Sequence, residues 1–301
     1  MEGRLPVVWH EAYEVDLGDH VFPTPKYRLV MERLLQEGTI KEEDVIKPGP
    51  APDQAIARIH HSDYIAKIKN GTLSPLEVTL LEVPFSPSLR ESAWIAAGGT
   101  ILTGELALER GLAVHLGGGF HHAFPDHGEG FCLINDVAVA IAELKARGVV
   151  RRAAVIDCDL HQGNGTAAIF AKDPSVFTFS IHQENNYPAR KPPSDLDVGL
   201  PDGAGDETYL AALRRHIPDI LERHRPDLVF YLAGADPYRE DQLGGLNLTM
   251  EGLRQRDLLV LEACRSRNLP VAVTLAGGYA RKLSDTVEIH CNTVRAAREL
   301  V

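Results

Sequence analysis

Two carboxylates and an imidazole occupy alternate positions of one short stretch, at Asp157, Asp159 and His161. They follow the apolar run 153–156, which predicts a buried strand. Alternate residues of an extended backbone point to the same side, so we expect these three side chains to converge. Charges crowded at the end of a buried strand are costly unless a cation lies between them. The stretch therefore favours a site for zinc or another first-row metal ion, although a charged strand end facing water would also fit the pattern.

The segments around this stretch predict an α/β protein. Strands are expected at 112–116, 153–156, 176–181, 228–233 and 271–275, with a further short strand at 55–60. Helices are expected at 27–35, 62–68, 91–110, 133–147, 207–223, 250–267 and 283–300. Apolar strands that alternate with helices are typical of a parallel sheet covered by helices on both faces. No linker or repeat interrupts the pattern, so we predict one domain over residues 1–301.

Polar residues and glycines collect at the carboxyl ends of four of these strands, which lie at one edge of a parallel sheet. Ligands of such sheets bind at that edge. The residues concerned are His121 and His122 after 112–116, Asp157, Asp159 and His161 after 153–156, Asp236 after 228–233, and Gly277, Gly278 and Tyr279 after 271–275. Singly, each has an ordinary explanation, such as a helix N-cap for Asp236. Together they predict a shared site.

Composition narrows the possible partners and the compartment. The 301 residues carry a formal charge of −11 without a basic cluster, which argues against a nucleic-acid-binding surface. No run approaches the ~20 apolar residues of a membrane span. The four cysteines show no CxxC spacing, so neither a zinc knuckle nor a disulfide framework is indicated. We expect a soluble cytoplasmic protein, with no prediction of its oligomeric state.

Several blocks of the sequence resemble the signature blocks of the zinc-dependent histone deacetylase family. They are Gly-Gly-Phe-His-His at 118–122, Gly-Phe-Cys at 130–132, Asp-Cys-Asp-Leu-His at 157–161 and Ala-Gly-Gly-Tyr at 276–279. The form His-Gln-Gly-Asn-Gly at 161–165 is most similar to the class IV enzymes. The resemblance extends from about residue 23 to the last helix. It implies the arginase/deacetylase fold, a single-domain α/β/α structure of three layers with an eight-stranded parallel sheet.

The resemblance also implies a catalytic zinc site. Asp159, His161 and Asp236 match the three zinc ligands of the family, an arrangement that leaves coordination positions open for water and substrate. His121 and His122 match its tandem active-site histidines. In the family the second of these, here His122, is the main general base and then the general acid, while His121 gives electrostatic support and orients water.

Further roles follow from the same resemblance. Asp157 matches the carboxylate behind His121, and Asn164 matches the residue behind His122, where many relatives have Asp. An amide holds an imidazolium less firmly than a carboxylate does, so we expect Asn164 to lower the basicity of His122. Tyr279 matches the tyrosine that hydrogen-bonds the substrate carbonyl.

The resemblance also implies a substrate tunnel and a structural potassium ion. Residues expected to line the tunnel are Gly130, Phe131, Tyr187, Leu243, Gly277 and Gly278, with ordinary core packing as the other explanation for Tyr187 and Leu243. A potassium site would use Asp157, Asp159, His161 and Ser180.

These roles predict a zinc-dependent hydrolase that removes acetyl or longer fatty acyl groups from the lysine side-chain amide by means of metal-activated water. Its substrate would be an acyl-lysine protein or peptide. An alternative is an amidohydrolase of small acylated amines such as acetylpolyamines, in which an acidic residue at the tunnel mouth, for example Glu184 or Glu240, would bind a second ammonium group. A binding protein without activity would not need both a base and Tyr279. Arginase-like binuclear manganese chemistry would need more carboxylate ligands than the sequence shows.

Overall fold

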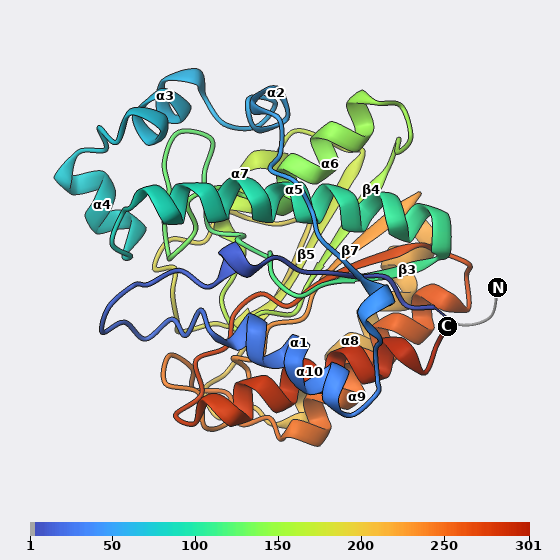
Figure 1. The fold of residues 1–301 in the computed structure, drawn as a ribbon. Coiled ribbons are helices and arrows are strands. Elements are labelled where there is room, and N and C mark those ends of the chain that lie inside the picture. Colours follow the sequence, from blue (N-terminus) through green and yellow to red (C-terminus); the bar gives the residue numbers. More distant parts are fainter. Residues whose placement is uncertain (1–3) are drawn as a thin grey trace.

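The computed structural model describes residues 4–301, and its centre is one eight-stranded sheet (Figure 1). The strands are β1 (Val7–Val8), β2 (Val45–Ile46), β3 (Leu112–His115), β4 (Ala153–Asp157), β5 (Val176–Gln183), β6 (Leu196–Leu200), β7 (Leu228–Leu232) and β8 (Val271–Thr274). Their order is β2-β1-β3-β8-β7-β4-β5-β6, with every neighbouring pair parallel. All the carboxyl ends therefore lie at one edge, as the sequence predicted.

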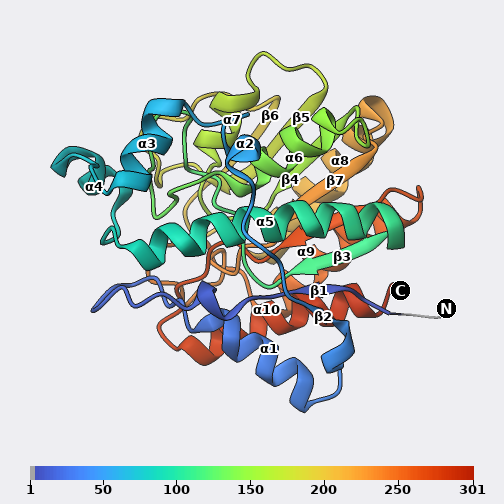
Figure 2. The same cartoon turned by 45° about the horizontal axis from the view of Figure 1, so that its top comes forward.

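Helices cover both faces of this sheet (Figure 2). One layer is built mainly from α5 (Pro87–Arg110) and α6 (Asp136–Ala146), and the other from α1 (Lys26–Gln36), α8 (Asp206–His224), α9 (Met250–Arg265) and α10 (Leu283–Arg298). The short helices are α2 (Asp53–Ile56), α3 (Ser62–Asn70), α4 (Pro75–Leu81) and α7 (Asn164–Phe170). Within residues 4–301, no helix is both long enough and apolar enough to cross a membrane.

Alternate strand residues pack into the two cores. In β4, Ala153 and Val155 belong to the core under α5 and α6, whereas Ala154 and Ile156 belong to the core under α8 and α9. All five residues of this strand are buried. A strand covered on both faces has no solvent side, which explains why β4 is apolar until its last residue.

Local signals set the helix ends. The Ser86 side chain accepts a hydrogen bond from the backbone N–H of Leu89, and Pro87 occupies the first turn of α5. The helix ends at Gly111, whose φ of +89° is a conformation that glycine adopts without strain. The long α5 therefore delivers the chain directly into β3, which begins at Leu112.

The predicted α/β/α architecture with an eight-stranded parallel sheet is confirmed, but the strand expected at 55–60 is wrong. Those residues continue from α2, with Asp53 in its first turn, into a turn. Ala55 and Ile56 are buried, as apolar residues on one side of a helical turn can be. The two-residue strands β1 and β2, the edge strand β6 and helix α4 were not predicted.

Candidate metal centre and active site

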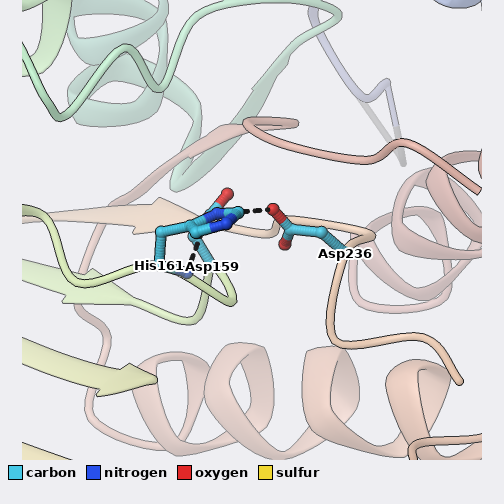
Figure 3. Close-up of side chains that lie close together, drawn as sticks. All are labelled: Asp159, His161 and Asp236. Carbon is cyan, nitrogen blue, oxygen red and sulfur yellow. Dashed lines mark hydrogen bonds and ion pairs between the residues drawn. The ribbon is translucent and has the colours of Figure 1, made fainter. Parts of the chain in front are cut away.

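Three potential metal ligands meet where β4 and β7 end (Figure 3). Potential ligand atoms of Asp159, His161 and Asp236 all lie within 4.8 Å of one another, and all three residues are buried. His161 Nδ1 is 3.2 Å from Asp159 Oδ1 and 3.3 Å from Asp236 Oδ2. Apart from this contact with His161, Asp236 Oδ2 has no hydrogen-bond partner. A buried carboxylate oxygen without a hydrogen bond is costly, so this geometry suits a bound cation.

The charges at this cluster favour the same conclusion. Burial lowers the pKa of His161, but Asp159 and Asp236 outweigh this effect and raise it to about 10. Burial, together with the negative charge of Asp159, raises the pKa of Asp236. A divalent cation would take the place of the proton on His161, because metal ligands bind in their deprotonated forms. Two oxygen donors and one nitrogen donor fit zinc with positions left open.

Glycines allow the backbone to approach these carboxylates closely. A Cβ atom at Gly277 would lie 2.2 Å from Asp236 Oδ2 and 2.6 Å from Asp159 Oδ2, and one at Gly234 would lie 2.6 Å from Asp159 Oδ2. The Gly277 N–H donates to Asp159 Oδ2 at 2.9 Å. The backbone at Gly277 therefore approaches both carboxylates closely, and any larger residue there would displace the ligands.

The tandem histidines lie beside the metal cluster, each with its own partner. His121 Nδ1 is 2.7 Å from Asp157 Oδ2, and His122 Nδ1 is 2.6 Å from Asn164 Oδ1. The two ring centroids are 4.1 Å apart. Burial lowers the pKa of His121, but Asp157 and Asp159 raise it to about 9. Burial, and then the positive charges of neighbouring histidines, hold the pKa of His122 well below its ordinary value. The two imidazoles thus differ in proton affinity.

A glycine turn after β3 aims the histidines at the cluster. Gly118 and Gly119 have φ of +69° and +82°, which glycine adopts without strain. Asp136, at the start of α6, accepts hydrogen bonds from the N–H groups of Gly119 at 3.0 Å and Phe120 at 2.7 Å. This carboxylate fixes the turn that leads into His121.

Tyr279 enters the same cavity from the loop after β8. Burial raises the pKa of Tyr279 well above its ordinary value, so its hydroxyl remains a proton donor at neutral pH. Asp241 accepts hydrogen bonds from the N–H groups of Tyr279 at 2.7 Å and Leu243 at 2.8 Å. Lys26 Nζ donates to the carbonyl of Ala276 at 2.9 Å and lies 5.5 Å from the centroid of the Tyr279 ring. Two buried side chains therefore hold this loop in place.

A narrow cavity connects these groups. Its lining includes Gly130, Phe131, His121, His122, Asp159, His161, Gly277 and Tyr279. The Tyr187 ring centroid lies 5.0 Å from that of His122 and 6.2 Å from that of His161. A Cβ atom at Gly130 would meet both Tyr187 and His122 within 3 Å, so only glycine fits between them. A larger hollow of about 690 Å³ lies at the opposite edge of the sheet, beside Leu112 and Val271, away from these groups.

Comparison with known proteins identifies the family. A family model described as "Histone deacetylase domain" matches residues 20–294. The chain belongs to the histone deacetylase family.

Three relatives and one solved structure show how similar this deacetylase-family protein is to known proteins. It is 46% identical to an uncharacterized protein of Picosynechococcus sp., over 98% of this chain and 99% of the relative. It is 28% identical to histone deacetylase 2 of Arabidopsis thaliana, over 95% of this chain and 78% of the relative. It is 31% identical to a histone deacetylase-like amidohydrolase of Pseudomonas aeruginosa, over 77% of this chain and 65% of the relative. A crystal structure of the HDA15 HD domain superposes with a TM-score of 0.80, at 23% identity over 99% of this chain and 88% of that one, which shows the shared fold.

Leu243, Gly278 and Ser180 of this deacetylase-family protein also have predicted roles, and they are not among the residues that line the cavity. Leu243 is half-buried beside Asp241, and Gly278 adopts a φ of +147° next to Tyr279. Ser180 pairs in register with Asp157 between β5 and β4, and its Oγ is 2.9 Å from His182 Nδ1. Their parts in the tunnel or in a potassium site, and the likeness to class IV enzymes, stay predictions.

Several residues that support the site could not be identified from the sequence. Arg256 of α9 is fully buried, and its Nη1 donates to the carbonyls of Gly234 at 2.5 Å and Cys158 at 3.2 Å, which joins the two loops that carry the metal cluster. Lys26 and Asp241, which hold the loop that carries Tyr279, also come from other segments of the chain. Glu129, next to Gly130, could have been suspected from that position alone.

Proposed function

We propose that this protein is a zinc-dependent deacylase that cleaves the side-chain amide of acyl-lysine in a protein or peptide. The observation that carries the proposal is the meeting of the Asp159, His161 and Asp236 cluster with two histidines and Tyr279 in one narrow cavity. Family membership supports a hydrolase of this type. In the proposal residues 1–301 form one catalytic domain.

The three cluster residues would hold one zinc ion. When bound there, zinc would polarise the acyl carbonyl of the substrate and lower the pKa of water towards ~7. Asp157, by accepting from His121, keeps that imidazole oriented beside the reacting water. The glycines around the cluster leave room for ion and substrate.

In the proposal His122 carries out both proton transfers of the reaction. With its Nδ1–H directed to Asn164, the other ring nitrogen has a lone pair that can take a proton from the attacking water. As the carbon–nitrogen bond breaks, the same nitrogen returns that proton to the amine, so that lysine leaves neutral and a carboxylic acid remains. Tyr279 donates a hydrogen bond to the carbonyl oxygen as negative charge develops, a contact worth roughly 2.7–4 kcal/mol.

Aromatic rings suit the aliphatic stem of lysine. The Phe131 ring centroid lies 5.7 Å from that of Tyr279, and Tyr187 stands edge-on to His122. In the proposal a linear side chain passes between Phe131 and Tyr187 to place its amide beside the cluster. Both rings exclude water from the reacting groups, which strengthens the electrostatic contacts there.

The test is hydrolysis of one lysine peptide that carries acyl groups from acetyl to myristoyl, with zinc-loaded protein. We expect Tyr279→Phe to lose most of the activity, whereas Tyr238→Phe, whose residue is not part of the cavity lining, should retain it. Equal activity of wild type and Tyr279→Phe would contradict the proposed mechanism. The profile of rates against acyl length would identify the substrate class.

A second candidate is hydrolysis of small acylated amines such as acetylpolyamines. The name of the Pseudomonas aeruginosa relative, a histone deacetylase-like amidohydrolase, favours it. Acetylated polyamines tested beside the peptides would separate the two candidates, because only this one predicts cleavage of polyamines without cleavage of peptides.

We also propose a structural potassium ion at Asp157, Asp159, His161 and Ser180, and a cytoplasmic location. All four cysteines are buried and unpaired, which suits a reducing compartment. No nucleic-acid partner is proposed for a protein of formal charge −11.

A further inference from the structure

A carboxylate outside the recognised motifs ends a hydrogen-bonded chain that leads to the proposed base. Glu129 Oε1 lies 2.7 Å from Asn164 Nδ2. The other polar atom of that amide, Asn164 Oδ1, lies 2.6 Å from His122 Nδ1. Carboxylate, amide and imidazole therefore form one continuous chain. It starts at a side chain that is about one fifth exposed and ends at a buried one.

The same carboxylate also contacts the tunnel wall. The Tyr187 hydroxyl donates to Glu129 Oε1 at 2.7 Å, and His127 Nε2 lies 3.4 Å from Glu129 Oε2. Burial tends to raise the pKa of Glu129, but His127, Tyr187 and Asn164 together hold it below its ordinary value. Glu129 is thus ionised at neutral pH.

An ionised carboxylate sets the direction of this chain because it has acceptor atoms only. The amide of Asn164 must therefore turn its NH₂ group towards Glu129 and its oxygen towards His122. That oxygen can only accept, so His122 must carry its proton on Nδ1. The other ring nitrogen then keeps its lone pair for proton transfer.

Without Glu129, the amide would have no such constraint. An asparagine rotated by 180° would present its NH₂ group to His122 and favour the opposite tautomer, with the lone pair on Nδ1. We propose that Glu129 is a positioning residue that fixes the amide of Asn164 and, through it, the catalytic tautomer of His122. The inference rests on the proposed function of His122 as the base.

The chain also explains why an amide suits position 164. A carboxylate there would lie within 3 Å of Glu129 without a proton between them, and like charges at that distance repel. The carboxylate of Glu129 and the amide of Asn164 thus complement each other as acceptor and donor. The negative charge lies one residue farther from the imidazole than it would with an aspartate at 164.

Kinetics of zinc-loaded variants test the pair. Glu129→Gln should lower kcat about 10-fold or more with little change in KM, because the defect lies in proton transfer. Asn164→Asp alone should also be impaired, whereas the double variant Glu129→Gln with Asn164→Asp should recover, since its single carboxylate, now at position 164, accepts from His122 in place of the amide oxygen. Glu82→Gln, a neutralisation in the same region, is the control and should keep its kcat. Tyr187→Phe removes the hydrogen bond from Tyr187 to Glu129 and so tests the tunnel wall separately.

The ¹⁵N shifts of the His122 ring test the same point without any substrate. In zinc-loaded protein labelled at histidine, wild type should show the proton on Nδ1, and Glu129→Gln should show a mixture of tautomers. If the tautomer is unchanged in Glu129→Gln, or if only KM rises, the positioning role is wrong and Glu129 serves the tunnel alone. If wild type cleaves no acyl substrate, the proposed function fails, and the ring shifts alone decide whether Glu129 sets the tautomer.

Discussion

Lys26 is fully buried, and replacing it by methionine should change how stability depends on pH. Its Nζ donates to the Ala276 carbonyl at 2.9 Å and lies 5.1–5.5 Å from the ring centroids of Phe22, Tyr27 and Tyr279. Burial lowers the pKa of Lys26 from 10.5 to about 8, although nearby carboxylates oppose the shift. Methionine is similarly long and unbranched and carries no charge, so Lys26→Met removes the titration with little change in packing.

The size and sign of the effect follow from that pKa. Each pH unit between folded and unfolded values corresponds to about 1.4 kcal/mol, so a charged Lys26 costs about 3 kcal/mol of unfolding free energy. Below pH 8 both states carry the proton and the whole cost is present. Between pH 8 and 10.5 the unfolded chain binds the proton more strongly, so wild-type stability rises with pH relative to the variant. Above 10.5 the cost has gone.

Urea unfolding of metal-free protein at pH 7.5 and at pH 10.5 measures this change. The stability advantage of Lys26→Met over wild type should fall by about 3 kcal/mol between the two values. The lost hydrogen bond to Ala276 affects both pH values equally, so it cancels from the comparison. The exposed Lys172→Met is the matched control and should follow wild type. A difference between Lys26→Met and wild type that stays constant with pH would show that Lys26 is not a buried cation at neutral pH.

Two further changes test the metal cluster and a buried histidine. Gly277→Ala should weaken zinc binding at least about 10-fold in a chelator competition, because its methyl group would displace two carboxylates. Gly49→Ala, with no atom within 4 Å of the added carbon, should bind zinc as wild type does, and equal affinity of both variants would contradict the predicted crowding. Burial lowers the pKa of His60 to about 4. As pH falls from 6.5 to 4, the unfolded chain binds a proton at this histidine that the folded state does not bind. Wild type should therefore lose about 3 kcal/mol of unfolding free energy over this range. His60→Gln should lack that loss in urea titrations, and an identical pH dependence in the two proteins would refute it.

The strands that could be predicted are those buried on both faces. β4 and β7 are apolar throughout their central residues, so their runs stand out in the sequence. By contrast, β6 is an edge strand of the sheet, and its residues alternate between half-buried and exposed up to the buried Leu200. The strands β1 and β2 are only two residues long. Strands so short are defined by their partners and leave no period to detect.

The site residues that could be predicted are those that follow directly after a strand. Asp159, His161 and Asp236 follow apolar runs, and parallel topology alone brings such ends together. The supporting contacts are different, because each joins segments far apart in the chain: Asn164 and Glu129 are 35 positions apart, and Lys26 and Ala276 are 250 apart. No periodicity relates such pairs, and only the assembled packing shows them.

The position of β8 has a consequence for the order in which the chain is made. β8 is the last strand to leave the ribosome, yet it lies between β3 and β7 in the middle of the sheet. A nascent chain that ends before Val271 already contains the three metal ligands, but its sheet is divided into two parts with open edges. Tyr279 follows only afterwards. A premature stop just before Val271 would therefore produce two half-sheets with open edges that are prone to aggregation, and no folded protein of lower activity.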